Sequence, residues 1–236
     1  MRTPGFILIS LGLLFPGTLP ASGFRGGTIY ESGSQRKKLL FSIHADLLAP
    51  NPGTRTFVSS YLDPQGQEVM TEKATFEDLH LQRYVISQKQ LGETYELTVD
   101  HAKMRFSVTR AGQTEVKERS LPENLVVGPS LVPFIQQHWS ELQGLHKVQA
   151  QLAVLDRKDT YGFEFMKVRE LQFEGQAAVL IRMSASSTLI AAVVHPTYLT
   201  VVPDGSRILE VKGRMLPKRK VGSRWEDFEG EAYFVY

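Results

Sequence analysis

Two neighbouring polar residues, His44 and Asp46, carry the first chemistry that the sequence suggests. Residues i and i+2 of a strand point to the same face, so an imidazole and a carboxylate would lie side by side there. Such a pair suits a metal site or acid–base catalysis. A metal site needs further ligands, however, and no other histidine stands at a short ligand spacing from this pair. We therefore interpret the pair as a partly exposed strand end, expect no metal and no cofactor, and keep an enzyme centred on it as a third hypothesis.

Other catalytic motifs are absent or incomplete. Ser34 and Lys37 have the S-x-x-K spacing of serine acyltransferases, but the S-D-N-like and K-T-G-like partners that this chemistry needs do not occur. The sequence has no nucleophile elbow, dinucleotide fingerprint or P-loop. The chain has no cysteine, which excludes disulfides, thiolate metal sites and a cysteine nucleophile. We expect a protein that is not an enzyme.

One local concentration of positive charge runs from Lys212 to Arg224, and four acidic residues follow it directly. It could form a docking patch for anionic lipid headgroups or for an acidic partner. The alternative is a solvated loop that joins two strands, with some cross-strand ion pairing. The residues that a docking function would use are Lys218, Arg219, Lys220 and Arg224.

Aromatic side chains make up 10% of the chain and give a second class of candidates. Most of them are expected to pack in the core. A curved sheet that does not close, however, leaves an apolar groove suited to an acyl chain or another hydrophobic ligand. The candidate ligand-binding residues are Phe41, Phe57, Tyr61, Tyr84, Phe106, Phe134, Trp139, Phe163 and Phe165.

The elements that must position these residues are mostly strands. Short β-branched and aromatic runs with a period of two alternate with turn residues, which predicts an antiparallel meander. Asp63-Pro64-Gln65-Gly66 predicts a type I turn between strands at 55–62 and 67–76. Further strands are expected at 39–45, 81–86, 94–99, 104–109, 114–121, 146–155, 161–168, 176–183, 198–202, 207–211 and 232–236. We interpret Phe24 to Lys38, rich in glycine, serine and charge, as a loose leader.

One segment breaks the period of two. Leu131, Phe134, Ile135, His138, Trp139 and Leu142 follow the spacing of an amphipathic helix, which we expect over 130–143. Ser130 suits its N-cap and Gly144 its end. A short second helix is expected from Ser186 to Val194. Because so many strands cannot form one flat sheet, we predict a mainly β (α+β) fold: a large curved antiparallel sheet or half-open barrel with one central amphipathic helix. A full barrel or a sandwich is the alternative.

The first 23 residues have the pattern of a secretory signal peptide. A basic start precedes an apolar run from Phe6 to Phe15, and small residues follow at a plausible cleavage site, Ala21-Ser22-Gly23. The run is too short to span a membrane before Pro16 and Gly17 break it. We expect residues 24–236 to form one exported β-rich domain, periplasmic or secreted. Its nearly balanced charge argues against nucleic acid as a partner.

Several short stretches resemble uncharacterised periplasmic β-rich proteins of the domain-of-unknown-function type. These stretches are Tyr61-Leu62-Asp63 with Gly66, Leu142-Gln143-Gly144 before Val148 to Leu155, and Pro196, Tyr198-Leu199, Arg207-Ile208 and Gly213-Arg214. The expected architecture is also similar to that of the lipoprotein-carrier half-barrels. That likeness implies acyl chains bound on a curved sheet beneath helices.

The leading hypothesis is an exported, non-enzymatic protein that binds a hydrophobic or lipid-like ligand in an apolar groove, with helix 130–143 controlling access. The alternative is a structural or interaction module of the cell envelope, which docks on a partner through a sheet edge and the basic segment 212–224.

Overall fold

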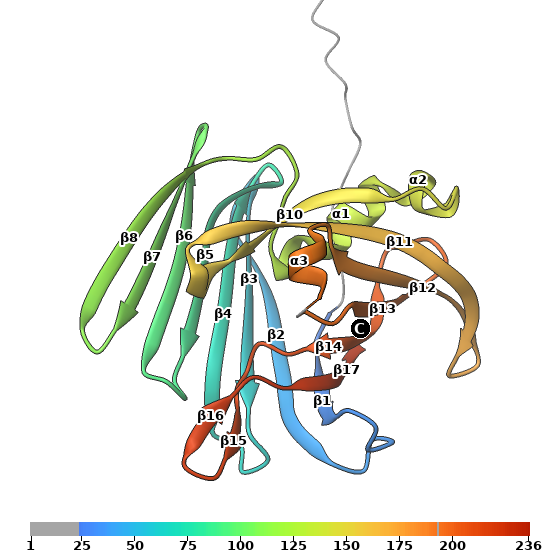
Figure 1. Cartoon of the computed structure of the whole chain (residues 1–236), viewed down its shortest axis with the longest axis horizontal. Coiled ribbons are helices and arrows are strands. Elements are labelled where there is room, and N and C mark those ends of the chain that lie inside the picture. The colour runs from blue at the N-terminus through green and yellow to red at the C-terminus, as the bar shows by residue number, and fades with distance from the viewer. Residues whose placement is uncertain (1–23, 193) are drawn as a thin grey trace, which may run out of the picture.

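The structure, a computed structural model, describes residues 24–192 and 194–236, so the predicted signal peptide at 1–23 lies outside the described residues. The protein is mainly β, and among the described residues fifteen strands form a single sheet (Figure 1). The sheet order is β8-β7-β6-β5-β4-β3-β2-β1-β17-β14-β13-β12-β11-β10-β9. A separate two-stranded hairpin joins β15 to β16. The predicted large curved antiparallel sheet is confirmed.

The strands of the first half follow one another along the chain and across the sheet. They are β1 (Gly26–Glu31), β2 (Leu39–Asn51), β3 (Thr54–Leu62), β4 (Glu68–Glu77), β5 (His80–Gln88), β6 (Glu93–Asp100), β7 (Lys103–Arg110) and β8 (Gln113–Ser120). The turn between β3 and β4 forms as predicted: the backbone N–H of Gly66 donates to the carbonyl oxygen of Asp63 at 2.9 Å. The amides of Gln65 and Gln67 also donate to the Asp63 carboxylate.

The second half continues the meander and returns to the first. Its elements are β9 (Leu125–Val126), η1 (Gly128–Ser130), α1 (Leu131–Gln137), α2 (Trp139–Gln143), β10 (Val148–Val154), η2 (Leu155–Arg157), β11 (Asp159–Phe173), β12 (Gln176–Ala185), α3 (Thr188–Ala191), β13 (Thr197–Val201), β14 (Ile208–Arg214), β15 (Arg219–Val221), β16 (Arg224–Glu226) and β17 (Glu229–Val235). The last strand, β17, pairs with both β1 and β14 and so joins the two halves. The outer strands β8 and β9 are not paired with each other, so the sheet is curved but not closed.

The expectation of a loose leader from Phe24 to Lys38 is wrong, because β1 lies in the middle of the sheet between β2 and β17. The glycines of β1 let the neighbouring strands β2 and β17 approach its backbone closely. A Cβ atom on Gly26 would lie 2.0 Å from the carbonyl oxygen of Ile43, and one on Gly27 would lie 2.3 Å from that of Tyr233. A glycine-rich segment that resembles a linker in composition is therefore a central strand.

The helix predicted over 130–143 is two short helices rather than one. At His138 the backbone leaves helical angles (φ −103°, ψ 16°), so α1 ends and α2 begins there. Phe134 in α1 packs against Phe165 with ring centroids 5.2 Å apart. Trp139 in α2 instead lies against Gly205, where an added Cβ would be 2.7 Å from the indole ring. The break at His138 thus separates two helices that pack on different partners.

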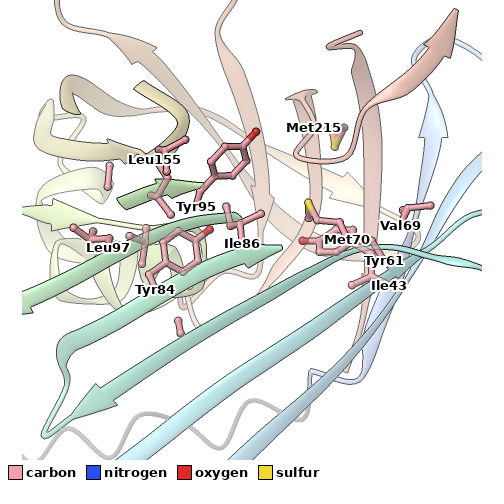
Figure 2. Close-up of a cluster of buried hydrophobic side chains, with 14 of the residues drawn as sticks. Ile43, Tyr61, Val69, Met70, Tyr84, Ile86, Tyr95, Leu97, Leu155 and Met215 are labelled. Carbon is pink, nitrogen blue, oxygen red and sulfur yellow. The ribbon is translucent and has the colours of Figure 1, made fainter. Parts of the chain in front are cut away.

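The described residues form two large hydrophobic clusters, one on each half of the sheet, and a small third one of Ala178, Val202 and Leu209. The first lies on β1–β7 and includes Leu155 from η2. Figure 2 shows Leu155 facing Tyr95 and Leu97 across the interior, while Ile43, Tyr61 and Met70 lie together farther along the same face. The second cluster joins α1 and α2 to strands β10–β14. Two half-buried side chains, Val211 and Phe234, pack against both clusters and mark where they meet.

Charged side chains bridge the gap between the two ends of the sheet. Lys117 on β8 donates to the carboxylate of Asp159, the first residue of β11, at 2.7 Å, and Arg119 donates to the same carboxylate at 3.1 Å. Lys158 also pairs with Glu115 of β8. We call these five residues the ionic seam. It holds η2 and the start of β11 against the edge strand β8 by side-chain contacts instead of a hydrogen-bonded ladder.

Candidate functional site

An apolar cavity of about 220 Å³ lies between β2, β3 and β4 of the first half, β14 and β17 of the second, and the segment η1–α1. Val211 and Phe234, which pack against both clusters, also line this cavity, so it lies where the two clusters meet. The residues around it are Phe24, Ile43, Ala45, Asp46, Phe57, Val58, Ser59, Tyr61, Glu72, Gly128, Pro129, Leu131, Val132, Pro133, Gln136, Ile208, Val211, Leu216, Phe234 and Tyr236.

Strand alternation brings the inner side chains of the first half to the cavity. Ile43 pairs with Tyr61, and Ala45 pairs with Ser59, so β2 and β3 present these residues on the same face. Ser59 in turn pairs with Glu72 on β4, which continues that face. The cavity floor is therefore made by consecutive antiparallel strands. The η1–α1 segment contributes the residues of the opposite side, from Gly128 to Gln136.

A buried carboxylate, Glu72, lies in this mainly apolar surface. Only 6% of the residue is exposed. The hydroxyl of Tyr84 on β5 donates to its Oε1 at 2.5 Å, and the hydroxyl of Tyr61 on β3 donates to its Oε2 at 3.0 Å. Each carboxylate oxygen thus has one tyrosine donor, from the strand on either side of β4. We call Glu72, Tyr61 and Tyr84 the acidic triad.

Burial sets the electrostatics of the acidic triad. Desolvation raises the pKa of Glu72 above its usual range, while the two tyrosine hydrogen bonds act in the opposite direction. Burial and the nearby Glu72 raise the pKa values of Tyr61 and Tyr84 well above their ordinary value. Both tyrosines therefore stay protonated and remain donors to Glu72. Within the described part of the chain, the hydrogen-bond donors to this carboxylate are the two neutral tyrosine hydroxyls.

Gly128 lets the η1–α1 segment approach the acidic triad closely. A Cβ atom at this position would lie 2.9 Å from Oε1 of Glu72 and 3.7 Å from the hydroxyl oxygen of Tyr84. The Ser130 hydroxyl donates to the carbonyl of Val127 at 3.0 Å and fixes the turn before α1. The backbone at the start of α1 consequently covers the carboxylate.

The structure places the nine predicted ligand-binding residues in three groups. Phe57 and Tyr61 line the cavity. Tyr84 does not line it but donates a hydrogen bond to the lining residue Glu72. The side chains of Phe41 and Phe106 are buried in the first cluster. The remaining four belong to the second cluster and do not line the cavity: Phe134, Trp139, Phe163 and Phe165.

The candidate pair His44 and Asp46 lies on the outer face of β2. Both residues are exposed, since Ile43 and Ala45 take the inner positions. Asp46 borders the cavity, but His44 does not. Within the described part of the chain, no group of three or more histidine, cysteine or carboxylate side chains could hold a metal ion.

The cations of the basic segment are largely engaged within the chain. Lys218 pairs with Asp227, and Arg219 donates to Glu31 at 2.7 Å. Lys220 lies 5.7 Å from the centroid of the Trp225 ring. Arg224 begins β16 and is exposed. These residues lie on and next to the projecting β15–β16 hairpin (Figure 1). The cross-strand pairing that we gave as the alternative therefore accounts for most of this charge, and a docking role stays a prediction.

Glu72 is not among the site residues predicted from the sequence, although the residue pattern of β4 contains a signal for it. On β4 the inward positions are Met70, Glu72, Ala74 and Phe76, all buried. A charged residue in phase with three apolar ones on a strand is the pattern of a buried carboxylate. The partners of Glu72 come from β3 and β5, so only the strand register shows that they are tyrosines.

The chain shows low similarity to known proteins. No protein-family model matches the chain, and no curated protein matches it. The chain is similar to a solved beta-barrel-like protein of the domain of unknown function DUF1849 from Brucella abortus. The TM-score is 0.46 at 8% sequence identity, over 90% of this chain and 94% of that chain. Similarity to the lipoprotein carriers stays a prediction. No helix of the described residues has the length and hydropathy needed to cross a membrane.

Proposed function

We propose that the protein is an exported, non-enzymatic binding protein that holds a hydrophobic or lipid-like ligand in the cavity between β2–β4 and α1. The observation that carries the proposal is the cavity itself: an apolar space of about 220 Å³ with one buried polar centre, the acidic triad. Binding sites for small molecules combine an apolar lining with a few placed polar groups in this way. The apolar wall would supply affinity, and the triad would orient the ligand.

The size of the cavity favours a slender ligand. Pockets for drug-sized molecules typically have volumes of about 300–1,000 Å³, and this cavity is smaller. A single alkyl chain suits it better than a bulky ring system. Each buried methylene group would contribute about 0.8 kcal/mol to binding, so a chain of moderate length is enough for measurable affinity.

Residues of α1 would control access. Leu131, Val132 and Gln136 all border the cavity, and α1 is only seven residues long. Entry of a ligand past α1 would require this helix to shift, because its Phe134 and Ile135 are buried in the second cluster. Export to the periplasm or the cell exterior, proposed from residues 1–23, would place such a carrier among membrane lipids.

The test uses the protein without its predicted signal peptide, purified without detergent. The protein is extracted with organic solvent, and the extract is analysed by mass spectrometry. The stripped protein is then titrated with a fluorescent fatty acid and a fluorescent long-chain alcohol. We expect saturable binding of at least one probe. The proposal would be contradicted if no lipid co-purified with the protein and neither probe bound to it.

A pair of variants on one strand gives the control. Ala45→Phe places a large side chain into the cavity, whereas Ala49→Phe makes the same change at an exposed position of β2 that does not border it. Binding should be lost in the first variant and kept in the second. Equal binding by both variants would show that the probe occupies another site.

A further inference from the structure

We propose that the ligand of this cavity is a single-chain amphiphile with a protonated amine at its polar end, and that Glu72 binds this amine. The inference rests on the proposed function, since it names the chemical class of ligand for the same cavity. Three observations carry it: the acceptor positions left on Glu72, the lack of a lysine, arginine or histidine among the described residues that line the cavity, and the apolar wall that surrounds the carboxylate.

The Glu72 carboxylate has acceptor capacity that the protein does not use. An ionised carboxylate offers about four lone-pair positions on its two oxygens. The described residues fill two of them, one by Tyr84 at 2.5 Å and one by Tyr61 at 3.0 Å. An ammonium group has three donors and no acceptor, so it complements the remaining positions on Glu72. A tyrosine pair alone satisfies the geometry of the carboxylate but leaves its charge uncompensated.

The charged side chains that line the cavity, among the described residues, are of one sign only. Among the described residues that line it there is no lysine, arginine or histidine, and its two ionisable acids are Asp46 and Glu72. Asp46 belongs to the exposed face of β2, which leaves Glu72 as the charged group inside. An anionic headgroup beside Glu72 would therefore meet a like charge and no cation of the described lining residues. A carboxylate or a phosphate is disfavoured at this site for that reason.

Burial makes a cationic ligand the natural partner of this carboxylate. A buried ion is costly unless it is paired, and burial accordingly raises the pKa of Glu72. A protonated amine beside Glu72 would stabilise the ionised carboxylate, while the alkyl chain behind the amine would contact Ile43, Phe57 and the side chains of α1. Glu72 would thus bind the polar end of the ligand, and the cavity wall would bind its alkyl chain.

The experiment compares decylamine, decanoic acid and 1-decanol, which share a chain length and differ at the polar end. Each is titrated calorimetrically, below its aggregation concentration, into the detergent-free protein at about pH 7, where an alkylamine is protonated. We expect decylamine to bind most tightly. Glu72→Gln keeps the shape of the side chain and removes its charge, so it should weaken decylamine about ten-fold to one-hundred-fold, as expected for a charge-assisted hydrogen bond. Binding of 1-decanol should change little.

Glu68→Gln is the matched control, because Glu68 is on the same strand and pairs with Lys89 outside the cavity. This variant should bind decylamine like the unaltered protein. Tighter binding of decanoic acid than of decylamine would overturn the inference while leaving a hydrophobic-ligand function intact. Equal decylamine affinity in Glu72→Gln would overturn it as well. No binding of any of the three chains would count against the proposed function itself.

Discussion

Replacement of Tyr84 by phenylalanine tests the acidic triad, because it removes one hydroxyl and leaves the ring. Tyr84 is 3% exposed and donates to Glu72, which is 6% exposed, so water has little access to replace the lost donor. Hydrogen bonds to charged groups contribute about 1.5–3 kcal/mol to stability. We therefore expect Tyr84→Phe to lower the free energy of unfolding by about 2 kcal/mol at pH 8.

The assay is equilibrium unfolding in urea, followed by circular dichroism. With a urea dependence of about 2 kcal/mol per molar for a chain of this size, the expected loss shifts the midpoint by roughly 1 M. The loss should shrink at pH 5. Burial raises the pKa of Glu72, so a larger share of Glu72 is already neutral there, and a neutral acceptor gains less from the hydroxyl.

Tyr95→Phe on the adjacent strand is the control. The Tyr95 hydroxyl also donates to a glutamate, Glu93, at 2.5 Å, but Glu93 keeps an ion pair with Arg110 at 2.8 Å. This variant should lose only about 0.5–1 kcal/mol. Equal losses for the two variants, or a Tyr84→Phe loss that does not change between pH 5 and pH 8, would refute the account of the triad.

Three further changes probe the same framework. The stability of Glu72→Gln relative to the unaltered protein should rise steadily as pH increases from about 4 to 8. The raised folded-state pKa of Glu72 gives the unaltered protein stability at low pH that it loses above that pKa, whereas the variant has no such group to lose. Urea midpoints across this range measure it, and a constant difference would contradict it. Gly128→Ala should cost about 1–3 kcal/mol, because its Cβ would meet the pinned Glu72 carboxylate at 2.9 Å; Gly144→Ala, with 3.4 Å to its nearest neighbour, is the thermal-unfolding control. Asp159→Asn should weaken the ionic seam by about 0.5–1 kcal/mol at low salt and less at high salt. Faster amide exchange in β8 would report that opening, and unchanged exchange would argue against the seam.

Local patterns were enough to predict most of the strands and the turn between β3 and β4. The hairpin around Asp63 and Gly66 follows from residues next to one another in the chain. The curved sheet follows from the number of strands, since a sheet of this size does not stay flat.

Long-range pairing could not be predicted in the same way. The place of β1 depends on β17, about 200 residues away, and its glycines resemble a linker unless that neighbour is known. The site has the same difficulty, because Tyr61, Glu72 and Tyr84 lie on three strands and meet only through their register. The break at His138 depends on where Phe134 and Trp139 pack, which no helical period reveals.

The most direct measurement of the central claim is to locate a bound alkylamine by intermolecular nuclear Overhauser effects to methyl groups. The account predicts contacts from the decylamine chain to Ile43, Leu131 and Val211, which line the cavity. It predicts none to Leu142 or Ile181, which are fully buried in the second cluster. Contacts confined to exposed methyl groups such as those of Leu189, or a saturated complex with no contact to Ile43, would contradict it.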